Sequence, residues 1–262
     1  MDTGLEIIQI NKKNKVFKVY NENKTFWENY LNSKWENDFF NYFENIENLD
    51  KKIFIDVGSS NGCLSLYASF FCKKVISLDP EEKYYKLLKK NLDLNKSINN
   101  VVPLHAALNT KDDIAEFKEG KNFTEIMFLN KNDTYKINLV TLETLLKKYA
   151  DNDKFIIKID IEGYEFDLLN DKRFMEIINK RKPEIFLGIH LGAGPLFKYK
   201  ISKFKFLQRF YNLHKTFLEY KLIYKLSNSY KKICINGAER HKLFFLKPEF
   251  YRKNLDIFYH NQ

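Results

Sequence analysis

The chain has 262 residues, of which 44% are hydrophobic and 16% aromatic. That is enough apolar material to bury the core of one large α/β domain, and it excludes a wholly disordered chain. The net charge of +10 comes from residues 196–262, which hold 15 Lys or Arg against 4 Asp or Glu. Such an excess is typical of a solvated basic surface, or of one that attracts an anionic partner.

The cysteines and the hydropathy pattern indicate in which cellular compartment the protein is expected. Cys63, Cys72 and Cys234 have neither paired nor metal-ligand spacing, which indicates a reduced compartment. No signal segment opens the chain, and no apolar run approaches the ~18 residues that a bilayer requires. The richness in Lys, Asn and Ile is typical of AT-rich coding. We therefore expect a cytoplasmic protein of a bacterium or of a virus-infected host cell.

The N-terminal part predicts a cap on the main domain. Residues 5–20 contain two short β-type runs around a polar turn and predict a hairpin. Residues 25–47 carry aromatic side chains at helical spacing and predict one helix that packs on the domain.

The central part alternates between apolar runs and amphipathic runs. We predict five strands at 53–57, 75–79, 101–108, 154–160 and 183–190, of which the first, second and fourth are followed directly by a helix and the fifth by a glycine-rich loop. The helix after the fourth strand covers 164–180. Residues 110–139 predict short antiparallel pieces or loops, and a helix follows them. Strands that alternate with helices predict a mostly parallel sheet with helical cover.

The C-terminal part predicts a helix over 202–217 and a closing antiparallel pair formed by 219–235 and 241–248. Nothing in the chain has the composition of an interdomain linker. We therefore expect a single domain over 1–262. Its parts are an N-terminal cap (1–50), a ligand-binding core (51–195) and a basic part (196–262) that helps to form the acceptor site.

A glycine turn links the first strand to its helix. Gly58 allows a sharp turn there, and Gly62 allows the helix to pack closely on the strand. Asp79 ends the second strand, 21 residues after Gly58, where an acid can bind both hydroxyls of a ribose. Its alternative role is to cap the next helix. A Rossmann dehydrogenase and a S-adenosylmethionine (SAM) enzyme both fit this pattern.

The middle of the turn favours SAM. A dehydrogenase prefers a second glycine two residues after the first, where its backbone approaches a pyrophosphate, and Ser60 stands there instead. SAM has no pyrophosphate. Asp56 can meet its methionine amino group, and the amides of the turn can meet its carboxylate.

Four segments resemble, in the order of the chain, the blocks of the FkbM family of SAM-dependent methyltransferases: FIDVGSSNGCLSL, VISLDPEEKYYKLLKKNLDLN, AALNTKDD and IIKIDIEGYEFDLL. The resemblance runs from about Trp35 to His190. It implies a class I methyltransferase fold, which is a Rossmann-like, seven-stranded, mostly parallel sheet with helices on both faces and a C-terminal antiparallel hairpin. It also implies methyl transfer to oxygen, often on a sugar hydroxyl.

The resemblance also implies a set of site residues. The SAM loop would consist of Asp56, Gly58, Ser60 and Gly62, with Asp79 on the ribose, Ala106 and Ala107 against the adenine, and Glu36 as a further member of the site. Two positions depart from the family pattern. Aspartate stands at 79 where glutamate is frequent, and Gly188 stands where an acid often precedes the histidine, which puts an acid role at 188 in doubt.

The segment KIDIEG supplies the reactive groups. Lys158, Asp160 and Glu162 would share one face if the extended backbone continued through Glu162. A sugar hydroxyl is very weakly acidic and needs a general base, a metal, or both. We predict that Glu162 is the general base and that Asp160 contacts the substrate or a divalent cation (Mg or Mn). A related clan of sugar methyltransferases has a similar acid pair.

Three other ionisable groups lie in or near KIDIEG, and the sequence assigns each of them a weaker role. His190 ends the next strand and is the alternative base, or only caps that strand. Lys158 neutralises nearby carboxylates. Glu165 lies in the first turn of a helix, where acids are common because of the helix dipole.

The expected acceptor is a sugar, a glycan, or a nucleotide- or lipid-linked sugar, with residues 196–262 as a possible contact for an anionic surface. The alternatives are an RNA ribose 2′-O-methyltransferase and a non-catalytic SAM-binding module. Amino-methylating nucleic-acid enzymes are disfavoured, because the chain lacks their [DN]PP[YFW] element.

Overall fold

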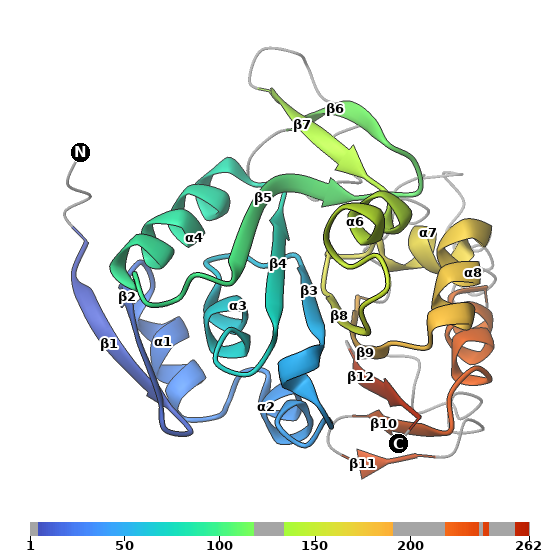
Figure 1. Cartoon of the computed structure of the whole chain (residues 1–262), viewed down its shortest axis with the longest axis horizontal. Helices are drawn as coiled ribbons and strands as arrows, with labels where there is room; N and C mark the ends of the chain where they lie inside the picture. Colours follow the sequence, from blue (N-terminus) through green and yellow to red (C-terminus); the bar gives the residue numbers. More distant parts are fainter. Residues whose placement is uncertain (1–4, 118–133, 191–217, 236–237, 241–254, 262) are drawn as a thin grey trace, which may run out of the picture.

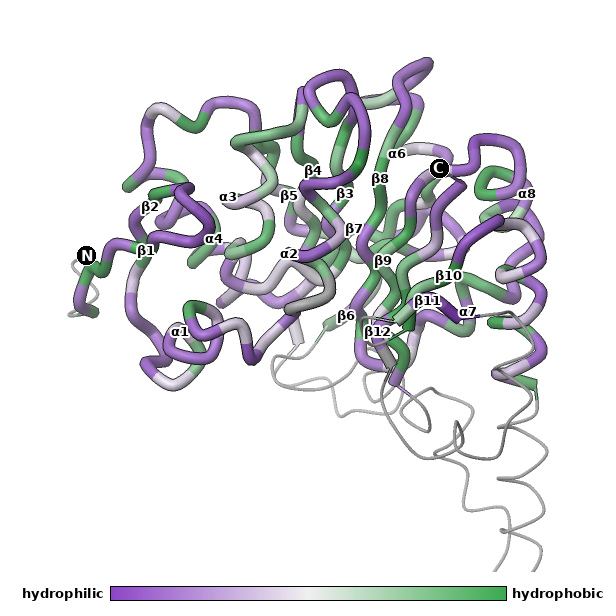
Figure 2. Tube along the Cα trace, turned by 90° about the horizontal axis from the view of Figure 1, so that it is seen from below, coloured by the Kyte–Doolittle hydropathy of each residue, from purple (hydrophilic) through white to green (hydrophobic). Residues whose placement is uncertain are grey.

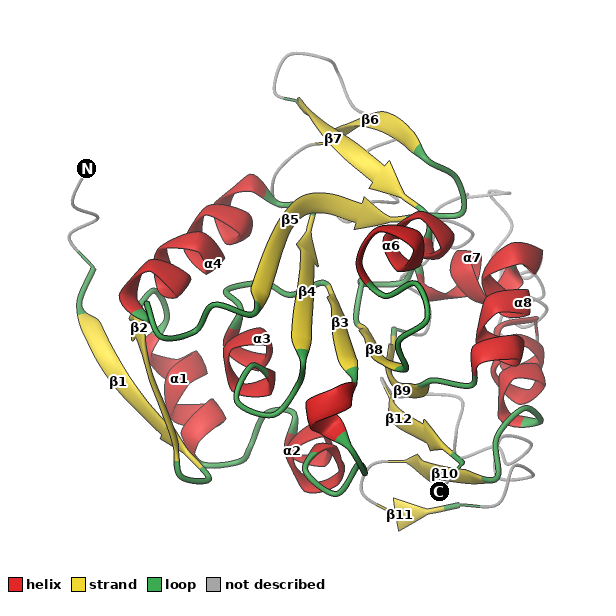
Figure 3. Cartoon of the chain, viewed as in Figure 1, coloured by secondary structure: helices red, strands yellow, loops and turns green. Residues whose placement is uncertain are grey.

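The computed structural model describes residues 5–117, 134–190, 218–235, 238–240 and 255–261. Their main feature is a twisted sheet of ten strands with helices around it (Figures 1 and 3). In their order across the sheet these are β11 (Ala238–Glu239), β10 (Lys232–Ile235), β12 (Leu255–His260), β9 (Glu184–Ile189), β8 (Phe155–Ile159), β3 (Ile53–Val57), β4 (Lys74–Asp79), β5 (Val101–Leu108), β7 (Tyr135–Val140) and β6 (Asp113–Phe117).

The seven strands from β10 to β5 correspond to the predicted sheet. The five from β9 to β5 are parallel, and β12 runs antiparallel to both β9 and β10. The count is ten rather than seven because β7 and β6 extend one edge and β11 extends the other. The predicted fold class is therefore confirmed, with an enlarged sheet.

The helices whose two ends both lie within the described residues are α1 (Lys24–Leu31), α2 (Asn37–Phe43), α3 (Cys63–Ala68), α4 (Glu82–Leu94), α6 (Leu142–Tyr149), α7 (Glu165–Asn170) and α8 (Lys172–Arg181). A 3₁₀ turn covers Leu49–Lys51, and residues 218–227 are also helical. None of the described helices is both long and apolar enough to cross a bilayer.

Two apolar cores lie on the two faces of the sheet. Successive side chains of a strand point to opposite faces, so Ile53, Ile55 and Val57 join the core beneath α6, α7 and α8, whereas Phe54 joins the other core. That second core is rich in aromatic rings from α1, α2 and α3 and also contains the hairpin of β1 (Ile7–Lys12) and β2 (Lys15–Tyr20). Figure 2 shows the hydrophobic stretches concentrated in the central strands.

The chain reverses its direction of growth across the sheet at β3. It adds β4 and β5 on one side of β3 and later adds β8 and β9 on the other. Open parallel sheets bind ligands at the carboxyl ends of their strands, next to such a switch point. The topology therefore directs attention to the ends of β3, β4 and β8.

Two predicted helices were wrong in their extent. Residues 25–47 form two helices, α1 and α2, because Ser33 and Glu36 adopt left-handed backbone angles between them. The predicted helix over 164–180 is divided at Asp171, whose side chain accepts from the amide of Phe174 and begins α8.

The predicted closing pair was only partly right. Residues 218–227 are helical because Tyr220, Ile223 and Leu226 are buried at a spacing of three. An antiparallel pair does close the sheet, but it joins β10 to β12. The other segments predicted here, 202–217 and 241–248, lie outside the described residues.

Asn91 of α4 and Asn95, the residue that follows α4, fasten the N-terminal hairpin to the core. Asn95 bonds the backbone of Lys18 through both ends of its amide, with its Oδ1 at 2.8 Å and its Nδ2 at 2.7 Å. Asn91 accepts from the amide of Tyr20 at 2.9 Å and donates to the carbonyl of Asn61, in the glycine turn, at 2.9 Å. The hairpin, α4 and the glycine turn are thereby joined through one buried side chain.

We expect Asn91→Ala to destabilise the fold by about 2 kcal/mol, because it leaves buried backbone groups of Tyr20 and Asn61 without their partner. Urea unfolding measures the change. Asn152→Ala is the matched control, since Asn152 is exposed and bonds only to neighbouring Asp151. Equal stability of the two variants would contradict this account of the hairpin.

Candidate active site

A cavity of about 460 Å³ opens at the carboxyl ends of β3, β4, β5 and β8. Its walls bring together most of the residues predicted for the site: Asp56, Gly58, Ser60, Asp79, Ala106, Ala107, Asp160 and Glu162. Phe26 and Trp35 add aromatic rings from the N-terminal cap. The volume is in the range typical of small-molecule sites.

The glycine turn has the shape that its residues predict. Gly58 has a φ of 81°, and a Cβ there would lie 2.0 Å from the carbonyl oxygen of Asp160. Gly62 has a φ of 83°, and its Cβ would lie 2.3 Å from Leu88 Cδ1 on α4. Only glycine combines these angles with such close approaches. The turn therefore brings β3 against the end of β8 and against α4.

Asp79 lines the cavity and holds the backbone on two sides of it. Its Oδ1 accepts from the amide of Glu81 at 2.9 Å, in the turn that leads into α4, although this bond does not cap the helix. Its Oδ2 accepts from the amide of Ser60 at 2.7 Å and holds the glycine turn, while the residue also lines the cavity. Burial raises the pKa of Asp79 to about 7, although both amides favour the carboxylate.

Asp56 lies at the floor of the cavity and is fully buried. It accepts from Ser65 Oγ at 2.6 Å, and Ser65 accepts in turn from Ser77 Oγ at 2.6 Å. Burial raises the pKa of Asp56 to about 6, and the nearby ammonium of Lys158 limits the rise. A cationic ligand in the cavity would stabilise this carboxylate further.

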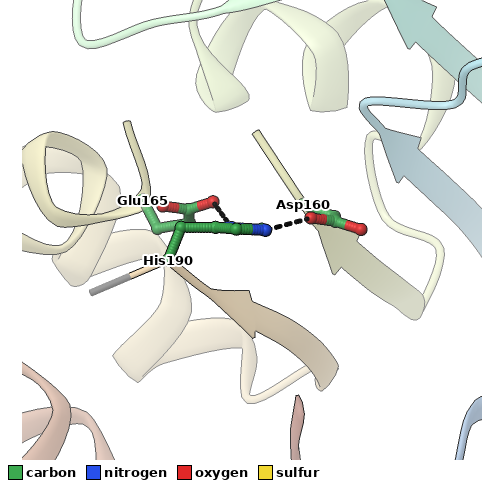
Figure 4. Close-up of side chains that lie close together, drawn as sticks. All are labelled: Asp160, Glu165 and His190. Carbon is green, nitrogen blue, oxygen red and sulfur yellow. Dashed lines mark hydrogen bonds and ion pairs between the residues drawn. The ribbon is translucent and has the colours of Figure 1, made fainter. Parts of the chain in front are cut away.

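An alternating chain of charges crosses the sheet edge beside the cavity. Lys158 Nζ lies 3.1 Å from Glu36 Oε1 and 2.9 Å from Asp160 Oδ2. His190 continues the chain, with Nε2 3.6 Å from Asp160 Oδ1 and Nδ1 3.2 Å from Glu165 Oε1 (Figure 4). We call Glu36, Lys158, Asp160, His190 and Glu165 the ionic chain.

The ionic chain fixes the protonation of its middle members. Burial disfavours charge on each of them, but their neighbours more than compensate. The ammonium of Lys158 and the imidazole of His190 lower the pKa of Asp160 below its usual value. Asp160 and Glu36 hold the pKa of Lys158 well above its usual value. The hydrogen bond with Glu165 raises the pKa of His190 to about 9.

Glu162 does not share a face with Lys158 and Asp160, because the extended backbone ends at Ile159. Glu162 follows in a turn with a φ of 57°, and its side chain is exposed at the cavity wall. His190 is placed differently again. It contacts Asp160 but does not itself line the described cavity.

Two positions gain roles that the sequence did not reveal. Glu165, expected to serve only the helix dipole, is completely buried and bonds His190. Gly188 makes room for Asp160, since a Cβ there would lie 3.0 Å from Asp160 Oδ1. The glycine that departs from the family pattern therefore accommodates the carboxylate of the neighbouring strand.

The same cluster is a candidate cation site. Asp160, Glu165 and His190 each offer one ligand atom, and these atoms lie within 4.8 Å of one another. In this arrangement, however, Asp160 is already paired with Lys158 and His190, and Glu165 is hydrogen-bonded to His190.

His190 predicts a pH-dependent contribution to stability. Its pKa is raised from 6.5 to about 9 on folding, so the contribution is complete below pH 6.5 and is lost as the pH rises through 9. We expect the melting temperature of wild type to exceed that of His190→Gln most at pH 6.5 and to approach it above pH 9.

His260→Gln is the control for this experiment, because the pKa of His260 is lowered, chiefly by burial. A pKa below 6.5 places this titration at or beneath the low end of the window, so between pH 7.5 and pH 9 the His260→Gln variant should differ from wild type by a nearly constant amount. A difference in melting temperature between wild type and His190→Gln that does not change with pH would contradict the raised pKa of His190.

Comparison with known proteins adds a family to this geometry. Residues 56–210 match the Methyltransferase FkbM domain. The comparison with curated proteins gave no match. Among solved structures, the chain is similar to the methyltransferase FkbM from Methylobacillus flagellatus KT, with 15% identity and a TM-score of 0.46 over 80% of this chain and 44% of that chain. The chain thus spans less than half the length of that protein.

Two other solved structures are similar at lower scores. Precorrin-6y C5,15-methyltransferase from Geobacter metallireducens GS-15 has 11% identity and a TM-score of 0.39 over 85% of this chain and 87% of that chain. A SAM-dependent methyltransferase from Anabaena variabilis ATCC 29413 has 13% identity and a TM-score of 0.36 over 88% and 86%. Because the domain match covers more than half of its residues, the chain belongs to the FkbM family of methyltransferases.

Proposed function

We propose that the protein is a SAM-dependent O-methyltransferase that acts on a hydroxyl of a sugar or glycan. One observation carries the proposal: a single cavity is lined by the glycine turn, by Asp56 and Asp79, and by the acids Asp160 and Glu162 of the neighbouring strand end. The first group suits an adenosine-type ligand with a cationic end. The second suits an acceptor that must lose a proton.

The residues of the cavity fit the cofactor that the family implies. Asp79 would accept from the ribose hydroxyls, and the small side chains of Ala106 and Ala107 would leave room for the adenine. Asp56, whose pKa burial raises to about 6, is a buried acid suited to a cationic amino group. The amide of Ser60 is already bonded to Asp79, so the hydroxyl of Ser60 on the cavity wall would bond the carboxylate instead. Bound SAM would supply a methyl group already activated by a positively charged sulfur.

The chain itself must then align an acceptor hydroxyl and remove its proton. Asp160 stays ionised between Lys158 and His190, so it can accept a hydrogen bond from the hydroxyl and orient it. Its lowered pKa makes it a weak base. Glu162, exposed at the cavity wall, is the proposed base, and it would take the proton as the acceptor oxygen gains the methyl group.

His190 is the less favoured base. Its pKa of about 9 keeps it protonated at neutral pH, and it reaches the cavity through Asp160 rather than directly. Mg or Mn could be held by Asp160, Glu165 and His190, but only if the proton shared by His190 and Glu165 were displaced. We propose that methyl transfer uses the charges already present in the ionic chain and needs no divalent cation.

The charge of residues 196–262 bears on the identity of the acceptor. The 15 Lys or Arg of residues 196–262 favour an anionic acceptor, such as a nucleotide- or lipid-linked sugar. The same charge favours RNA as the second candidate, with a ribose 2′-hydroxyl as acceptor. A non-catalytic SAM-binding module would bind the cofactor but transfer nothing.

The direct test offers methyl-labelled SAM together with sugar, nucleotide-sugar, lipid-linked glycan and RNA pools, with and without EDTA. We expect label in a sugar-containing fraction, undiminished by EDTA, and a loss of about 100-fold in Glu162→Gln, which lacks the base. Label in RNA alone would refute the sugar acceptor. SAM binding without any transfer would instead identify a binding module.

Cofactor affinity is expected to depend on pH through Asp79. Its pKa of about 7 means that the apo protein carries mostly neutral acid at pH 6 and mostly carboxylate at pH 8. Because the carboxylate is the better acceptor for ribose hydroxyls, we expect SAM to bind about tenfold more tightly at pH 8 than at pH 6.

Isothermal titration calorimetry at the two pH values measures this dependence. Asp79→Asn is the control, since its amide cannot titrate and should remove most of the difference. An affinity of the wild type that does not change between pH 6 and pH 8 would contradict the assignment of Asp79 to the ribose.

A further inference from the structure

Glu165 has a side chain that the helix dipole does not explain. An acid in the first turn of α7 would stabilise the helix from an exposed position, by well under ~1 kcal/mol in most cases. Glu165 is instead 0% exposed, and its Oε2 has no hydrogen-bond partner among the described residues. Burying a carboxylate in this way costs more than the dipole returns. The position therefore requires another explanation.

The other oxygen of Glu165 makes two contacts. Oε1 accepts from the amide of Ile161 at 2.9 Å and lies 3.2 Å from His190 Nδ1. Ile161 directly follows Asp160 in the chain, and His190 presents Nε2 to Asp160 Oδ1 (Figure 4). One buried oxygen thus restrains Asp160 from two directions, through the backbone that follows it and through the ring that faces it.

The bond to Nδ1 also determines which nitrogen faces the site. A carboxylate at Nδ1 requires that this nitrogen carry a proton, so Nε2 is directed to Asp160. Gly188, beside Asp160, leaves just enough room for the carboxylate in this position. Each contact around Asp160 therefore favours one orientation of its side chain.

We propose that Glu165 is a positioning residue for methyl transfer, which holds Asp160 in the orientation that receives the acceptor hydroxyl. The inference rests on the proposed function, because Asp160 is assigned there to the acceptor. Glu165 touches neither cofactor nor acceptor and acts through His190 and the turn after β8. Small displacements of an aligned group reduce transfer strongly, so its loss affects the rate rather than binding.

Glu165→Gln is the main variant. It keeps the length and one acceptor oxygen but removes the charge that orients His190. With the acceptor found in the labelling assay, we expect kcat to fall about 10- to 100-fold while the KM for SAM stays within about twofold. The melting temperature should not fall in proportion, because the substitution also removes a buried, partly unpaired carboxylate. Glu165→Asp keeps the charge and should recover part of the lost kcat.

Asp167→Asn is the matched control, because Asp167 is also an acid of the first turn of α7 but is not a member of the ionic chain. It should leave kcat unchanged. A Glu165→Gln enzyme with wild-type kcat would overturn the proposal. So would a variant whose activity falls only as far as its folded fraction, since Glu165 would then be structural.

A spectroscopic readout separates this inference from the proposed function. In ¹⁵N-histidine-labelled apo protein at fixed pH 7.5, we expect His190 to carry protons on both nitrogens in wild type and Asp167→Asn, but not in Glu165→Gln. An unchanged His190 spectrum in Glu165→Gln overturns the positioning role. If wild type methylates no acceptor at all, the proposed function fails, and this spectrum still decides whether Glu165 orients His190.

Discussion

The buried ammonium of Lys158 is the interaction on which the rest of the site depends. Its side chain is only 4% exposed, and it is paired with Glu36 and Asp160. A buried ion pair adds little net stability, but removing one partner leaves a charge that cannot be solvated. Glu36 directly precedes α2, so this requirement ties the N-terminal cap to the end of β8. The cap lies outside the matched FkbM domain, yet it supplies Phe26 and Trp35 to the cavity wall and Glu36 to the ionic chain.

The acids of the cavity differ in whether their charge is already compensated. Asp160 has cations on both sides, and its pKa is lowered, whereas Asp56 and Asp79 are buried and their pKa values are raised to about 6 and about 7. Acids of the second kind gain most from a ligand that brings positive charge or hydrogen-bond donors. Asp160, by contrast, is already held in its ionised form by its two cationic neighbours. Environments that separate pKa values in this way commonly separate functional roles.

The sequence predicted what local patterns determine. The parallel strands, the glycine turn and the position of Asp79 follow from hydropathy, from glycine and from the end of a strand, and all three are found. Glu165 could not be predicted, because its role depends on His190, which arrives from another strand 25 residues later. The shared face of Asp160 and Glu162 failed for a local reason. Glu162 adopts a left-handed angle before Gly163, and the glycine was the available signal for a turn.

Some of the departures from ordinary backbone angles lie at the cavity. Ser60, Glu162 and Glu36 adopt left-handed angles without being glycine, and all three lie in or beside the site. The unpaired oxygen of Glu165 is next to them. Elsewhere, left-handed residues such as Lys13 and Asn14 lie in a plain hairpin turn, where such angles are expected. Strain and uncompensated polarity persist only where the surrounding structure enforces them. The cavity wall therefore carries conformations that the α/β framework does not need, and that the proposed alignment of an acceptor hydroxyl would use.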